Sequence, residues 1–220
     1  MKTIMQSYYG RVEQGQIVLL EDVEIPEGSE AIVTILPEPD PLDVALSNLK
    51  AAIAKLPGKR QDIITKWLVK WSRYLSLEDS FKPEYVPRYK RGDIVYVDFG
   101  FNVGAEYGGV HYAAVLEHDN NKTNGNIMVV PLTSLDAGKT PADVAAADLY
   151  IGGGVIPWTL VDTVAKPSQI RAVSKMRIIK PLKKGDKWAR LSPAHLDAID
   201  ERIRQTIMKP APLSNSHALK

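Results

Sequence analysis

A carboxylate, an imidazole and two hydroxyl groups follow one another between residues 91 and 134. Glu106 lies in a segment with four glycines, His111 directly follows that segment, and Thr133 and Ser134 end an apolar run. Such positions, where a predicted strand meets a loop, often carry functional residues. Imidazole titrates near neutral pH, so His111 is suited to accept or donate a proton. The spacing therefore indicates a site for proton transfer, with Glu106 as the complementary carboxylate.

Each of these residues also has a structural interpretation. A lone histidine near the start of a strand is more often structural than catalytic, Glu106 can cap the glycine-rich loop, and Thr133 is ordinary at a strand end. Asp93 and Asp98 flank a predicted strand and point to opposite faces because they are five residues apart. We therefore expect no metal site there. His118, His195 and His217 lie in no motif and receive no role.

The strands that must position these groups recur between residues 88 and 190. Short apolar runs at 94–98, 112–117, 127–132, about 160–165 and 175–180 alternate with Gly, Asn, Asp and Pro. This pattern is typical of a small closed β-barrel. Residues 137–156 are rich in Ala and Gly with little periodicity, which predicts a long surface loop. After it, a helix capped by Ser192 carries one apolar stripe.

Four separated motifs in this region resemble the MazF/PemK family of toxin ribonucleases. They are RGDIVYVDF at 91–99, GAEYGGVHYAAVL at 104–116, VVPLTS at 129–134 and SQIRAVSKMRI at 168–178. The resemblance implies an α+β fold built on a small SH3-like β-barrel of the MazF/CcdB type. The family usually has an arginine and then a proline after the glycine pair, where this chain has His111 and Tyr112.

The resemblance also implies an activity. It suggests a sequence-selective endoribonuclease toxin that cleaves single-stranded RNA by attack of the 2′-hydroxyl, with no metal and no cofactor. Carried onto this sequence, the catalytic residues are Glu106, His111 and Thr133, and the RNA-binding residues are Ser134, Arg171, Gly108 and Gly109. Histidine in place of the family's arginine changes the chemistry of the site. The alternative is a catalytically inactive module that binds nucleic acid or protein.

The N-terminal part of the chain divides differently. We expect a small acidic β module at 1–37, with a strand at 30–36, then a Pro-rich linker at 38–41 and a helical hairpin at 42–87. The barrel domain with its C-terminal helix then occupies 88–210, and 211–220 form a disordered tail. Within the hairpin, Trp67 and Trp71 are expected to be core or interface anchors. Residues 10–36 resemble small antitoxin-type β modules.

Net charge and residue composition indicate which kinds of molecule the protein is expected to bind. Residues 1–40 hold two basic and eight acidic side chains, a balance of −6, whereas residues 41–91 hold eleven basic and five acidic ones, a balance of +6. A basic segment attracts phosphate, although solvated helix faces give the same pattern. Without cysteine or an apolar run of eighteen residues, we expect a cytoplasmic protein with no membrane contact. The expected partners are RNA, an antitoxin (separate or the N-terminal module) and a second copy of the chain.

Overall fold

The computed structural model describes residues 7–35, 37–156, 159–179 and 189–208. It contains two compact units, residues 1–50 and residues 51–220. The second unit carries every residue that the sequence assigns to a site, so the first is described only briefly. The domain boundaries expected from the sequence remain predictions.

A two-stranded hairpin is the β structure of the first unit. Strand β1 (Gly10–Glu13) pairs with β2 (Gln16–Leu19), and the turn between them has positive φ at Gln14 and Gly15. Two central residues with positive φ fit a tight hairpin turn. The strand predicted at 30–36 is absent from residues 30–35, where Ile32 is 91% exposed. The alternating apolar residues pair with no neighbouring strand among the described residues. The segment therefore lacks the hydrogen bonds that would make it a β-strand. Helix α1 (Pro41–Ala54) follows.

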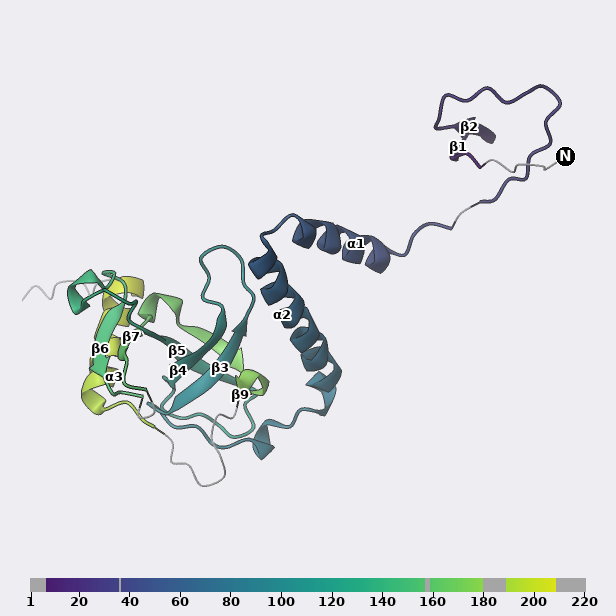
Figure 1. Cartoon of the computed structure of the whole chain (residues 1–220). Coiled ribbons are helices and arrows are strands. Elements are labelled where there is room, and N and C mark those ends of the chain that lie inside the picture. The colour runs from purple at the N-terminus through teal and green to yellow at the C-terminus, as the bar shows by residue number, and fades with distance from the viewer. Residues whose placement is uncertain (1–6, 36, 157–158, 180–188, 209–220) are drawn as a thin grey trace, which may run out of the picture. The chain divides into compact units, whose positions relative to one another are not determined.

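The second unit is built on one antiparallel sheet (Figure 1). Its strands are β3 (Ile94–Gly100), β4 (Gly109–Val115), β5 (Asn126–Ser134), β6 (Leu149–Gly153), β7 (Asp162–Ala165), β8 (Arg171–Ser174) and β9 (Ile178–Ile179). They are ordered β6-β7-β5-β4-β3-β9, and β8 also pairs with β5. With its helices the unit is α+β, as expected. No pairing among the described residues joins β6 to β9, so closure into a barrel remains a prediction.

Both faces of the sheet are buried, which explains the nearly continuous apolar runs of β3, β4 and β5. Neighbours in a strand point to opposite faces. Val95, Val97 and Phe99 therefore belong to one core, and Ile94 belongs to the other. Helix α3 (Pro193–Ile207) covers the second core through Ile199 and lies beside β6 in Figure 1. It begins as predicted, because the Ser192 hydroxyl accepts a hydrogen bond from the backbone N–H of His195.

Two predictions in this unit were wrong. The segment 137–156 is not a single loop, because it contains a 3-10 turn at Pro141–Asp143 and strand β6, which pairs with β7. The strand predicted at 175–180 is interrupted by a 3-10 turn at Lys175–Arg177. Lys175 is 2% exposed and its Nζ donates to the backbone oxygen of Asn121 over 2.9 Å. A buried ammonium requires such a partner, and the turn lies where Lys175 makes this contact.

Helix α2 (Gly58–Leu77) packs against the end of β3 where the glycine-rich loop begins. Lys70 forms an ion pair of 2.9 Å with the buried carboxylate of Asp98. The Arg177 guanidinium lies 5.3 Å from the ring centroid of Trp67, and its Nε donates to the backbone oxygen of Asp98. Trp67 is therefore an anchor, as predicted, whereas Trp71 is 49% exposed. Two 3-10 turns, at Glu78–Ser80 and Pro83–Tyr85, connect α2 to the sheet.

Candidate active site

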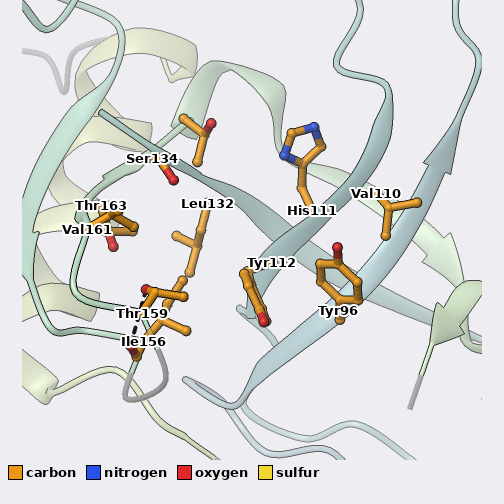
Figure 2. A pocket seen from close by; sticks show the side chains of 11 residues that line it. Tyr96, Val110, His111, Tyr112, Leu132, Ser134, Ile156, Thr159, Val161 and Thr163 are labelled. Carbon is orange, nitrogen blue, oxygen red and sulfur yellow. Dashed lines mark hydrogen bonds between the residues drawn. The ribbon is translucent and has the colours of Figure 1, made fainter. Parts of the chain in front are cut away.

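A cavity opens where two central strands part. β4 and β5 pair from Val115–Val129 to Tyr112–Leu132, and beyond that point β5 pairs with β7. The gap left between the strands has a volume of about 230 Å³. Its described lining consists of Tyr96, Val110, His111, Tyr112, Leu132, Thr133, Ser134, Ile156, Thr159, Val161 and Thr163. We call this cavity the histidine cleft (Figure 2).

Three of the residues predicted for the site line this cleft together. His111 comes from β4, where it lies opposite Val97 of β3, while Thr133 and Ser134 are the last two residues of β5. Figure 2 shows His111 on the side of the cleft opposite Ser134. His111 is inside β4, not before it, so the sheet fixes its backbone. The imidazole and the two hydroxyl-bearing residues thus come from the two strands that diverge.

The glycine pair gives His111 its place. The backbone of Gly108 forms a hydrogen bond with the imidazole. A Cβ on Gly109 would lie 3.3 Å from Nε2 of His111, and the φ of Gly109 is +83°. Only glycine fits both the conformation and the contact without strain. Gly108 and Gly109 therefore support the histidine, and neither is among the residues that line the cavity.

Burial is the main influence on the charge of His111. It lowers the pKa of the imidazole from the usual 6.5, and the positive charge of Lys166 lowers it further. The hydrogen bond with the Gly108 backbone acts in the opposite direction but does not outweigh burial. Burial therefore favours the neutral imidazole. A neutral imidazole has a nitrogen lone pair free to take a proton from a substrate hydroxyl.

Two further residues near His111 were missed by the sequence interpretation. The Tyr107 ring packs against the imidazole, with ring centroids 4.6 Å apart. Its buried hydroxyl makes no hydrogen bond of good geometry among the described residues. Burial raises the pKa of this hydroxyl, and the nearby Thr133 side chain partly opposes that rise. Lys166, whose charge acts on His111, is held by Asp148 over 2.8 Å. The tyrosine was visible inside the GAEYGG motif, but Lys166 and Asp148 lie in stretches without any motif.

Glu106 and Arg171 line a second cleft. This cavity measures about 260 Å³ and is bounded by Glu106, Ser168, Gln169, Ile170 and Arg171. Gln169 accepts a hydrogen bond from the backbone N–H of Tyr107, and Arg171 donates to the backbone oxygen of the same residue. We call it the Glu106–Arg171 cleft. The structure therefore does not bring Glu106 or Arg171 into the cavity that His111 lines.

The two carboxylates expected to flank a strand, Asp93 before β3 and Asp98 within it, are engaged in separate ion pairs. Asp93 is bound by Arg190 over 2.6 Å, and Asp98 is bound by Lys70. Within the described residues, no cluster of three or more histidine, aspartate or glutamate side chains is arranged to hold a metal ion. No described helix combines the length and the apolar character needed to cross a membrane.

Comparison with known proteins decides the family. The model of the PemK-like, MazF-like toxin of type II toxin-antitoxin systems matches residues 90–207, more than half of the chain. The chain belongs to this family. The match begins at β3 and ends with α3, so it includes both clefts and excludes residues 1–89. None of the comparisons supports an antitoxin-like module in residues 1–37, and a search of curated proteins finds no match.

Solved structures of toxins of this kind match about half of the chain. A mycobacterial endoribonuclease in complex with its cognate antitoxin is 13% identical, with a TM-score of 0.38, over 56% of this chain and 99% of that chain. MazF from Deinococcus radiodurans is 19% identical, with a TM-score of 0.41, over 55% and 96%. Mycobacterium tuberculosis toxin MazF-mt6 is 12% identical, with a TM-score of 0.33, over 51% and 93%.

Proposed function

We propose that this toxin-family chain is an endoribonuclease that cuts single-stranded RNA in the histidine cleft without a metal ion. One observation carries the proposal. A neutral imidazole and the hydroxyl-bearing residues Thr133 and Ser134 line one cavity, in a chain that the family match assigns to the toxins. RNA contains its own nucleophile, so a protein that supplies a base and hydrogen-bond donors has the groups that cleavage needs.

The proposed reaction is an internal transfer of the phosphoryl group. His111 takes the proton of a ribose 2′-hydroxyl while that oxygen bonds to the adjacent phosphorus. The bond from phosphorus to the 5′ oxygen of the next nucleotide breaks, and this oxygen receives the proton from the imidazolium, directly or through water. The products are a 2′,3′-cyclic phosphate and a free 5′-hydroxyl. DNA is spared because it lacks the attacking group.

The other residues share the remaining tasks. Thr133 and Ser134 donate hydrogen bonds to the phosphoryl oxygens, whose negative charge grows in the transition state. Lys166 provides a nearby positive charge, which Asp148 keeps in place. Tyr107 is a positioning residue that supports one face of the imidazole. Because Glu106 and Arg171 line their own cleft, we assign them to a flanking nucleotide, where the guanidinium binds phosphate.

Product analysis tests this function directly. Purified full-length protein is incubated with end-labelled single-stranded RNA in EDTA, and the product ends are identified by mass. We expect cyclic phosphate and 5′-hydroxyl ends, and no cleavage of RNA with 2′-deoxyribose at the cut position. Tight RNA binding without cleavage would instead support the inactive binding module. Cleavage of the 2′-deoxy substrate would exclude attack by the 2′-hydroxyl.

We further propose that the chain acts as a homodimer and that its acidic N-terminus restrains activity. Residues 1–40 have a net charge of −6 and the remaining 180 residues have a net charge of +8, so the two parts attract each other electrostatically. Deletion of residues 1–40 is expected to raise the cleavage rate at low salt, and an unchanged rate would discard this restraint.

Light scattering during size-exclusion chromatography measures the dimer. An antitoxin partner is expected to suppress cleavage when added in excess.

A further inference from the structure

The histidine cleft contains a buried hydroxyl that the proposed reaction does not use. Thr163, in β7, is 1% exposed, and its Oγ1 has no hydrogen-bond partner among the described residues. An unpaired buried hydroxyl costs about 1–3 kcal/mol, so proteins seldom keep one without a reason. Thr163 lines the cavity, and Figure 2 shows it on the wall opposite Tyr112. The nearby Thr159 differs, because its hydroxyl donates to the backbone oxygen of Ile156.

The walls of the cavity suit a flat, neutral group with a polar edge. No lysine, arginine, aspartate or glutamate is among the described lining residues, so a phosphate would find no cation inside. Tyr96 and Tyr112 form an aromatic pair on one side, with ring centroids 4.7 Å apart. Leu132 and Ile156 add apolar surface. The volume of about 230 Å³ is below the roughly 300–1,000 Å³ of ordinary small-molecule sites, and it suits one ring system better than a whole nucleotide.

We propose that the histidine cleft is a nucleobase pocket and that Thr163 is its specificity-determining residue. This inference rests on the proposed function, because it places one unstacked base of the RNA beside the phosphate that the 2′-hydroxyl attacks when His111 takes its proton. Single-stranded RNA is read in this way, with bases stacked on aromatic side chains and hydrogen-bonded at their edges. The base stacks on Tyr96 and Tyr112, and its polar edge meets the Thr163 hydroxyl. A base that offers the complementary group there binds better than one that leaves the hydroxyl unpaired.

Binding to RNA that cannot be cut separates this pocket from the cleavage reaction. The full-length protein is titrated with four 2′-fluoro RNA homopolymers, which lack the attacking hydroxyl. We expect the wild type to prefer one base about tenfold over the least favoured one, the discrimination of one hydrogen bond. Thr163→Val removes the hydroxyl at nearly constant shape and should reduce the preference to threefold or less. Thr163→Ser restores the hydroxyl and should restore most of it. Thr65→Val, on the exposed face of α2, is the matched control.

Thermal unfolding distinguishes recognition from a structural role. Because the hydroxyl has no hydrogen-bond partner within the described ranges, Thr163→Val should melt at the same temperature as the wild type or higher. Loss of base preference with undiminished stability supports the pocket. Equal binding of all four homopolymers by the wild type, or an unchanged preference in Thr163→Val, would overturn it. A base preference without cleavage of ordinary RNA would keep the pocket and refute the nuclease function instead.

Discussion

The histidine cleft and the Glu106–Arg171 cleft differ in chemistry although one loop contributes to both, through Tyr107 packed on His111 and through Glu106 in the second lining. The histidine cleft is lined by hydroxyls, aromatic rings and a neutral imidazole, and it opens where strands of the sheet diverge. The Glu106–Arg171 cleft is lined by opposite charges and polar groups from the loop and from residues 168–171. The first suits proton transfer and a buried base, and the second suits an exposed charged strand. Adjacent residues of one motif, Glu106 and Tyr107, thus serve two different sites.

The difference shows how a sheet and a loop distribute functional residues. His111 is held by pairing with β3, so its position is set by the strand register. Glu106 is exposed on the loop, and Tyr107 is held there through backbone hydrogen bonds with Gln169 and Arg171. A residue of a paired strand keeps its geometry, whereas a loop residue depends on such contacts. We therefore expect proton transfer to depend on the histidine cleft alone.

Removal of the imidazole should have the largest effect. His111→Ala is expected to lower kcat on single-stranded RNA by about 10²–10⁴-fold, the usual contribution of a general base. His118→Ala is the matched control, since His118 is an exposed histidine that lines neither cleft. Rates measured at saturating RNA, with circular dichroism to verify folding, decide the result. A similar loss in both variants, or none in His111→Ala, would contradict the assignment.

The start of the loop that carries Glu106 and Tyr107 can be disturbed at Gly100. Its φ is +79°, and a Cβ there would lie 2.7 Å from the Trp67 ring. Gly100→Ala should therefore lower the free energy of unfolding by about 2–3 kcal/mol, from backbone strain and the clash together. Gly104 also has positive φ but open space around its Cα, so Gly104→Ala should cost only about 1–2 kcal/mol. Denaturant titration compares the two. Equal losses would show that α2 does not fix the loop.

The Glu106–Arg171 cleft should govern affinity more than rate. Arg171→Ala is expected to weaken RNA binding by about tenfold and to reduce the salt dependence by about 0.7 in the logarithmic slope, one phosphate contact on a single strand. Its kcat should remain within about threefold of wild type. Glu106→Ala should leave kcat equally intact. Arg204→Ala removes an exposed arginine from α3 and is the control. A fall in kcat comparable with that of His111→Ala would merge the two clefts into one site.

Lys166 should produce the smallest change, a shift in pH dependence. Its charge lowers the pKa of His111, so Lys166→Met should raise that pKa and move the acidic limb of kcat/KM to higher pH. At pH 7 the rate should fall only through the loss of the positive charge that Lys166 provides near the phosphate. Lys139→Met, which removes an exposed lysine from another ion pair, should leave the limb in place. A limb that moved to lower pH in Lys166→Met would contradict the electrostatic role.

The sequence predicted the central strands and three residues of the cleft, because apolar runs and local motifs encode them. It could not show that β4 and β5 part after Tyr112–Leu132, since strand pairing is a long-range property. For the same reason the sequence motifs do not show that Glu106 and Arg171 line a different cavity from His111. The sequence did not predict strand β6, because its apolar stretch, Leu149 to Ile151, is shorter than the roughly four to eight residues that indicate a strand. No local sequence pattern indicates the ion pair between Lys166 and Asp148 or the position of Thr163 in the histidine cleft.

The pH dependence of kcat/KM on one single-stranded RNA, in EDTA, tests the central claim most directly. Burial lowers the pKa of His111 from its usual 6.5, and the base must be neutral to act. We therefore predict an acidic limb with its midpoint below pH 6.5 in the wild type, and no such limb in the residual activity of His111→Ala. A midpoint above pH 6.5, or the same limb in both proteins, would contradict the assignment of His111 as the base.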